Sequence, residues 1–262
     1  MKKFMFAATV AAAMAGFAVE SQIVGYGTNN TGSNLYPTYG TGFMSMTATE
    51  KGNFRLGDLK LTGAACSTDW LNFIDPTTSI IDATKNVTYY SEAEAISDGG
   101  TADDAEWEDL YENNKDDVEY PIGTGFLCNF VSTGVTLTYA GEVNQDPLYA
   151  TIDCTGKPYA FVNNIYPGDL TFGQIKLVDA ACSTDWLNFV DPTTSIVDAS
   201  KNITYYSEVE AIADGGTAED AEWEDLYENN KDEVPLKMGE GFLCNFVSPS
   251  VKIVFPVHSS AK

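Results

Sequence analysis

A long internal repeat dominates the sequence. Residues 65–132, which begin ACSTDWLNF and end GFLCNFVS, return as residues 181–248 at an offset of 116 without a gap. Of the 68 aligned positions 13 differ, and most differences are conservative, such as Ile74 against Val190. Near-identical copies of this length predict two copies of one structural unit. A chain of 262 residues is long enough for two ordinary domains.

The repeat sets the expected domain boundary. Its alignment continues through Tyr139 and Phe255 at the same offset. Upstream, LYPTY (residues 35–39) weakly resembles LYATI (residues 148–152) at an offset of 113. No Pro- or Ser-rich linker separates the copies. We therefore predict a first unit over residues 19–139, a second over residues 140–262, and a rigid junction between them.

The first residues have the pattern of a secretory signal peptide. Lys2 and Lys3 precede an apolar stretch that ends in small residues near Ala18. We interpret residues 1–18 as a signal peptide, which predicts an exported protein of the periplasm, cell surface or extracellular space. No later segment reaches about 20 apolar residues, so we expect no membrane-spanning helix.

The chain is strongly acidic, with a formal net charge of −24 and Arg55 as its only arginine. Such a charge repels nucleic acid and anionic membranes, so we exclude both as partners.

Cysteine spacing favours one disulfide bond in each copy. Cys66 and Cys128 are 62 residues apart, and so are Cys182 and Cys244. Export makes oxidation plausible, although four buried free thiols are the alternative. Cys154 has no counterpart, so it is either a buried thiol or a site of intermolecular linkage.

Most of each unit has strand character. Short β-branched and aromatic runs separated by glycine turns, such as NVTYYS and GFLCNFVS, predict a mainly β fold. We expect two tandem domains with β-sandwich or barrel-like architecture.

An acidic insertion of two short helices is predicted in each copy. Ser91 and Glu94 match a capping box, and Gly99-Gly100 suits the end of that first helix. A second helix is predicted to start at Thr101. The residues from Trp107 to Tyr111 have helical spacing and would give this helix an apolar face.

The residue types limit the chemistry. His258 is the only histidine, so a Ser-His-Asp triad or histidine-based metal site in each copy is excluded. Paired carboxylates remain, as in a glycoside hydrolase. The candidates in the first copy are Asp69, Asp75, Asp98, Asp104, Glu106 and Asp109, each with a counterpart 116 residues later. The sequence selects no catalytic pair among them, and most suit a solvated helix face or helix caps.

Two binding sites are candidates. Oxygen ligands around a glycine turn suit a structural calcium ion, although helix caps explain the same residues. These ligands are Asp98, Asp103 and Asp104, with Asp214, Glu219 and Asp220 in the second copy. Trp70 and Trp186, each beside polar residues, are the best exposed aromatic side chains for binding a glycan.

Several short segments resemble a group of uncharacterised exported repeat proteins of some Gram-negative bacteria. They are ESQIVGY near the start, GTGFLCNF (residues 123–130) and TLTYAGEV (residues 136–143). The resemblance implies a β-rich extracytoplasmic module and supplies no catalytic residues.

Together, these features predict a non-catalytic structural or adhesive module of the cell envelope or surface. Its partner would be a protein or glycan, and self-association is an option. A carbohydrate-binding module and a carboxylate-dependent glycoside hydrolase are the alternatives.

Overall fold

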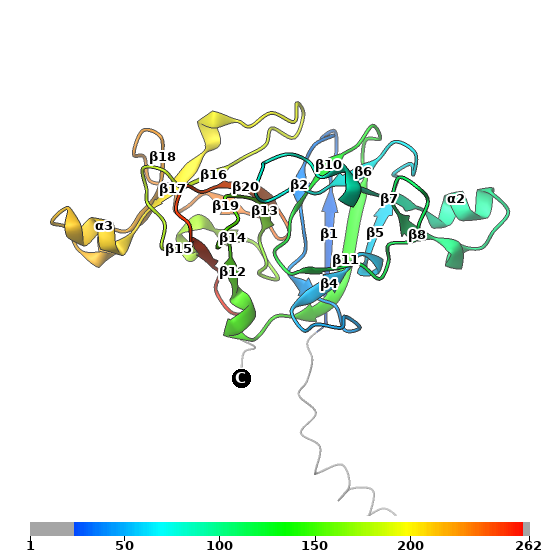
Figure 1. The fold of residues 1–262 in the computed structure, drawn as a ribbon, viewed down its shortest axis with the longest axis horizontal. Coiled ribbons are helices and arrows are strands. Elements are labelled where there is room, and N and C mark those ends of the chain that lie inside the picture. The colour runs from blue at the N-terminus through cyan, green and yellow to red at the C-terminus, as the bar shows by residue number, and fades with distance from the viewer. Residues whose placement is uncertain (1–23, 259–262) are drawn as a thin grey trace, which may run out of the picture.

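The computed structural model describes residues 24–258. Strands hold 36% of the residues and helices 13%, which confirms the predicted mainly β class. Figure 1 shows two groups of sheets side by side, with the helices α2 (Glu92–Ser97) and α3 (Glu208–Ala213) at opposite ends. The signal peptide predicted over residues 1–18 lies outside the described residues.

The first unit contains two antiparallel sheets and a short ribbon. The four-stranded sheet has β11 (Thr136–Val143) at its centre, pairing with β1 (Val24–Asn30), β3 (Phe43–Met44) and β5 (Leu59–Thr62). The five-stranded sheet has the order β2 (Thr38–Tyr39), β10 (Phe126–Asn129), β6 (Trp70–Asn72), β7 (Val87–Tyr90) and β8 (Glu106–Glu108). The ribbon pairs β4 (Asn53–Arg55) with β9 (Glu119–Pro121).

The second unit repeats this plan. Its five-stranded sheet has the order β13 (Tyr159–Asn163), β20 (Gly241–Asn245), β16 (Trp186–Asn188), β17 (Ile203–Tyr206) and β18 (Glu222–Asp225). The facing sheet has the order β12 (Thr151–Asp153), β21 (Lys252–Val254) and β15 (Lys176–Val178). The ribbon pairs β14 (Leu170–Thr171) with β19 (Pro235–Leu236). Short 3-10 helices span Leu56–Asp58, Ala83–Lys85, Ala102–Asp104, Pro147–Ala150, Phe172–Gln174, Ala199–Lys201 and Ala218–Asp220.

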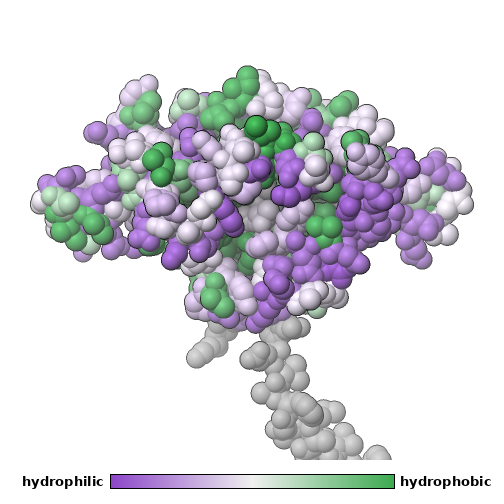
Figure 2. Space-filling view, viewed as in Figure 1, coloured by the Kyte–Doolittle hydropathy of each residue, from purple (hydrophilic) through white to green (hydrophobic). Residues whose placement is uncertain are grey.

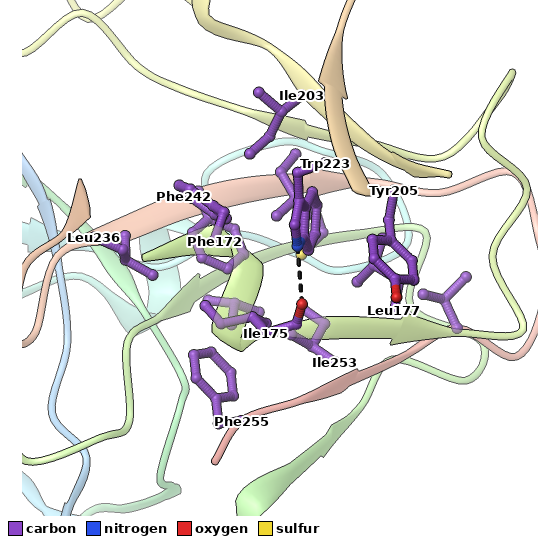
Figure 3. Close-up of a cluster of buried hydrophobic side chains, with 14 of the residues drawn as sticks. Phe172, Ile175, Leu177, Ile203, Tyr205, Trp223, Leu236, Phe242, Ile253 and Phe255 are labelled. Carbon is purple, nitrogen blue, oxygen red and sulfur yellow. Dashed lines mark hydrogen bonds between the residues drawn. The ribbon is translucent and has the colours of Figure 1, made fainter. Parts of the chain in front are cut away.

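Each unit has its own buried core between its sheets. In β5 the leucines Leu59 and Leu61 are buried while Lys60 and Thr62 are exposed, as the period of two of a strand requires. The core of the second unit is centred on Trp223, whose Nε1 donates a hydrogen bond to the Ile175 carbonyl oxygen at 2.8 Å (Figure 3). Its counterpart Trp107 is also fully buried.

The second predicted helix of the acidic insertion starts after Thr101 but is only the 3-10 helix Ala102–Asp104, and its predicted continuation over Trp107 to Tyr111 is wrong. Trp107 lies in strand β8 between two glutamates, while Leu110 and Tyr111 are 65% and 80% exposed. The carboxylate of Asp109 accepts hydrogen bonds from the backbone N–H groups of Tyr111 and Asn113, which folds this segment into a turn. The first predicted helix is confirmed as α2, with the capping box of Ser91 and Glu94 formed.

The two five-stranded sheets meet through reciprocal backbone contacts. Tyr39 in β2 bridges to Glu240 in the second unit, and Val162 in β13 bridges to Thr124 in the first. Each contact maps onto the other, because Thr124 and Glu240 are repeat equivalents. The junction is therefore pseudo-two-fold symmetric.

Two further hydrogen-bond pairs follow the same symmetry. The Tyr36 N–H donates to the Pro192 carbonyl oxygen at 2.8 Å, and the Tyr159 N–H donates to that of Pro76 at 3.0 Å. The strand registers of β2 and β13 give the N-terminal segments an offset of 123. The offset of 113 suggested by LYPTY and LYATI is thus wrong, because those sequences occupy different places in the two units.

The chain passes from one core to the other after β11. Val143 packs in the first core, and Ile152 packs against the second.

Among residues 24–258, no helix has the length and apolar character needed to span a membrane. Hydrophilic side chains cover much of the face in Figure 2, and a small hydrophobic patch marks the α3 end, where Val209 and Ile212 are exposed.

Candidate functional site

A row of side chains crosses the outer face of each five-stranded sheet. In the first unit, Trp70 in β6 lies opposite Asn129 in β10 and Thr88 in β7, and Thr88 lies opposite Glu108 in β8. Residues one step along each strand, such as Leu71, point to the core instead. The predicted glycan residue Trp70 is therefore half-buried on the outer face.

This row forms one wall of a pocket, which we call the acidic pocket. In the second unit its volume is about 600 Å³. It combines the half-buried Trp186 and the phenol of Tyr206 with several carboxylates. The lining residues are Cys182, Ser183, Trp186, Thr204, Tyr206, Glu210, Asp214, Glu224, Asp225, Leu226 and Glu228. The same residue types occur at the matching positions of the first unit, which are 116 residues earlier.

Helix α2 fixes one side of the pocket through Glu94. One carboxylate oxygen of Glu94 accepts hydrogen bonds from the N–H and hydroxyl of Ser91, at 2.9 and 2.7 Å. The other accepts from the Cys66 N–H at 2.9 Å. Burial opposes ionisation, but these donors hold the pKa of Glu94 below its usual value. Glu210 makes the matching hydrogen bonds in the second unit.

Glu108 has a different environment on the other side. Its carboxylate accepts a hydrogen bond from the Cys66 thiol at 3.4 Å. Partial burial and neighbouring carboxylates raise its pKa. Burial and the same carboxylate raise the pKa of Cys66 to about 12, so this thiol stays protonated at neutral pH. In the second unit Glu224 has a raised pKa, and that of Cys182 is about 11, for the same reasons.

The predicted calcium ligands are not assembled into a metal site. Asp98 accepts a hydrogen bond from the Tyr90 hydroxyl at 2.9 Å, and the carboxylate of Asp104 accepts one from the Thr101 N–H at 2.7 Å. The copies Asp214 and Asp220 make the same contacts. Asp103 and Glu219 are exposed. Within residues 24–258, no group of three or more metal-ligating side chains is placed to hold an ion.

The carboxylates considered for a glycoside hydrolase, none of which was predicted to be catalytic, are dispersed in local structural roles. Asp69 is fully buried and accepts backbone hydrogen bonds. Asp75 binds Thr77 in its own turn. Glu106 bonds to Asn114, and Asp109 forms a 2.8 Å ion pair with Lys115. Of these candidates, only Asp98 and Asp109 have copies that line the acidic pocket.

The predicted disulfide bonds are also absent, because all five cysteines are free thiols. Cys128 lies in β10 opposite Leu71, so its side chain points into the core. Cys66 lies beside Thr88 and Glu108 on the outer face. The sheet thus separates the two thiols, and the same holds for Cys182 and Cys244.

Two symmetry-related grooves lie at the junction of the units. The apolar groove, of about 410 Å³, has Phe73, Ile122, Ile152 and Phe161 among its lining residues, with Lys157. In the polar groove, of about 430 Å³, Phe189 takes the position that Phe73 has in the apolar groove. The other residues that line the polar groove include Asn29, Asn30, Asn34, Lys237 and Glu240. Equivalent backbone therefore carries different chemistry in the two grooves.

The sequence pattern indicates Trp70 and Trp186 but not the carboxylates that line the acidic pocket with Trp186. Glu94 fits a helix cap, and helical spacing puts Glu108 on a predicted helix. The alternation Glu-Trp-Glu at residues 106–108 is the signal that would have placed Trp107 inward and Glu108 outward.

Comparisons of the chain with models of protein families, with curated proteins and with solved structures find no match.

Proposed function

We propose that the chain is a non-catalytic, exported binding module of the cell envelope or surface, and that each acidic pocket binds a carbohydrate. The observation that carries this proposal is the acidic pocket of the second unit, whose tryptophan, tyrosine and carboxylates all recur at the matching positions of the first unit.

The pocket chemistry suits a polyhydroxylated ligand. A half-buried indole such as that of Trp186 provides a flat apolar face for the C–H groups of a sugar ring. Ionised carboxylates accept hydrogen bonds from hydroxyl groups. Glu224 is a suitable acceptor, because the only protein donor bonded to it is the weak thiol donor of Cys182 at 3.7 Å in the part of the chain described.

Hydrogen bonding in the pocket favours binding over catalysis. Glu94 and Glu210 are held by three donors each, so neither is free to act as a nucleophile or base. Two sites of the same residue composition in one chain suit bivalent attachment, because the second binding event then occurs at a high effective concentration.

The test is binding of the full chain to immobilised polysaccharides, with Trp70→Ala, Trp186→Ala and the double variant. We expect each single variant to lose at least tenfold in apparent affinity through lost avidity, and the double variant to lose binding. Tyr111→Ala and Tyr227→Ala are matched controls, since these rings are 80% exposed and Tyr227 does not line the pocket. Undiminished binding by the double variant would refute the assignment.

A carboxylate-dependent glycoside hydrolase is the second candidate. One observation favours it: burial and neighbouring carboxylates raise the pKa of Glu108, as suits a general acid. This candidate predicts release of reducing sugar from a bound polysaccharide, lost in Glu108→Gln with Glu224→Gln. Binding without release would leave the binding module as the function.

A further inference from the structure

The apolar groove at the junction of the units has the size and lining of a small-molecule site. Ligand pockets enclose about 300–1,000 Å³ and are lined mainly by apolar side chains with a few polar groups. This groove encloses about 410 Å³, and both units contribute apolar side chains to it. They include Phe73, Tyr120 and Ile122 from the first unit and Ile152 and Phe161 from the second. The groove is therefore a product of the junction.

Packing and backbone hydrogen bonds hold the walls of the groove in place. The rings of Phe73 and Tyr120 stack with their centroids 4.6 Å apart and an angle of 8° between their planes. Ile152 reaches across from the second unit to Gly123, where an added Cβ would lie 2.3 Å from the Ile152 Cδ1. Phe161 is buried, and its carbonyl oxygen accepts a hydrogen bond from the N–H of residue 125 at 2.8 Å. The apolar surface is thus already formed before a ligand arrives.

A lysine supplies the polar part of the lining. Lys85 and Lys157 line the groove, and Asp153 is the only carboxylate among the lining residues. Asp153 accepts a hydrogen bond from the Thr155 N–H at 2.9 Å, and Lys85 is paired with Asp82 at 3.2 Å. Lys157 takes part in none of the ion pairs found among residues 24–258. Its ammonium group can therefore pair with an anionic ligand, in contrast to the acidic pocket, which is lined by five carboxylates and no lysine.

The polar groove shows which residues give the apolar groove this character. Strand registers and the hydrogen bonds of the turn after each first strand set the offset of 123 between the two grooves. At this offset the residues Ile152, Lys157 and Phe161 of the apolar groove have the counterparts Asn29, Asn34 and Thr38. Two apolar side chains and a cation thus occur together in one groove, and three neutral polar side chains in the other. A ligand with an apolar body and an anionic end needs both features at once.

We propose that the apolar groove binds a small carboxylate with an apolar chain, such as a medium-chain fatty acid. The chain packs on Ile152 and Phe161, where it leaves water. The carboxylate pairs with the ammonium group of Lys157 through a charge-assisted hydrogen bond. This site is separate from the acidic pocket, and its ligand does not depend on whether that pocket binds a carbohydrate.

The test is isothermal titration calorimetry of the full chain with octanoate, and with octan-1-ol as the neutral probe of the same chain length. We expect one octanoate per chain and at least fivefold weaker binding of octan-1-ol. Lys157→Asn, which inserts the residue of the polar groove, should weaken octanoate binding to the level of the alcohol and leave alcohol binding unchanged. Absence of octanoate binding, equal affinities for the two probes, or no effect of Lys157→Asn would overturn the proposal.

A second variant tests the apolar part of the site. Ile152→Asn combined with Phe161→Thr inserts the residues that the polar groove carries on equivalent backbone, and it should abolish binding of both probes. Lys237→Asn in the polar groove is the control and should leave both affinities unchanged. Undiminished binding by the double variant would also refute the site. If the double variant does not fold, Lys157→Asn still decides, because the Lys157 side chain is exposed.

Discussion

The buried carboxylate of Asp69 gives the sharpest stability prediction. One of its oxygens accepts the N–H groups of Val131 and Ser132 at 2.6 and 3.1 Å, and the other accepts that of Ala65 at 2.7 Å. The side chain is 0% exposed. It therefore holds the turn before β6 to the segment after β10. We expect Asp69→Asn to weaken this link while preserving the shape of the side chain.

The magnitude follows from the number of acceptor oxygens. The Asn amide has one acceptor oxygen, so at least one backbone N–H would face an NH₂ group. Losing a hydrogen bond to a charged acceptor costs about 1.5–3 kcal/mol, and the unsatisfied N–H adds about 1–3 kcal/mol. We expect a loss of about 3 kcal/mol in the free energy of unfolding. Asp185→Asn is the matched variant, because Asp185 makes the same three bonds.

The assay is urea unfolding followed by tryptophan fluorescence. With a denaturant slope of about 2 kcal/mol per molar urea, the midpoint of the affected unit should fall by roughly 1.5 M. Asp75→Asn is the control, because Asp75 lies in an exposed turn and bonds within it. A shift below about 0.3 M in both Asp69→Asn and Asp185→Asn would refute the reasoning that this carboxylate is a structural link.

Three further outcomes are expected. Trp107→Phe should cost about 2 kcal/mol in unfolding free energy, since it removes the buried indole N–H bond and part of the core volume; an unchanged melting temperature would contradict this. The raised pKa of Glu108 means that the native state keeps the proton of this carboxyl group to higher pH than the unfolded state does. The contribution of Glu108 to stability therefore falls as pH rises above about 4.5. Glu108→Gln should flatten the plot of melting temperature against pH in that range, and an unaltered profile would exclude this effect. Gly239→Ala should lower the melting temperature more than Gly156→Ala. Both glycines have positive φ, but only at Gly239 would an added Cβ lie 2.5 Å from the Tyr139 hydroxyl. Equal shifts in melting temperature would argue against tight packing at the junction.

Much of the fold could be predicted from local patterns. The strand Val87–Tyr90 and the capping box at Ser91 are short-range features, and both are formed. The helix predicted after Thr101 does not continue through Trp107. Three apolar residues with helical spacing also fit a structure in which the first lies in a strand and the other two lie in the turn that follows it. Asp109 decided between these structures through hydrogen bonds to backbone groups two and four residues ahead.

The site and the placement of the thiols depended on information that the sequence does not display. Which face of a strand a side chain occupies depends on register, and the pairing of β10 with β6 places Cys128 inside. Cys66 lies in the turn before β6, and its thiol bonds to Glu108 on the outer face. The offset of 123 between the N-terminal segments is invisible in the sequence, because these segments share almost no sequence. Trp70 was identified from its polar neighbours alone, whereas Glu108 required the pairing of β7 with β8.

The reciprocal contacts at the junction resemble those of a two-fold homodimer. In a dimer of identical chains, any substitution alters both symmetry-related sites at once. A single chain that contains both halves is free of that constraint, so one groove can change while the other is kept. The replacements of Pro121 by Lys237 and of Thr124 by Glu240 have this character, since each alters one groove only. Covalent fusion thus allows one architecture to carry two unlike clefts alongside two copies of the residues of the acidic pocket.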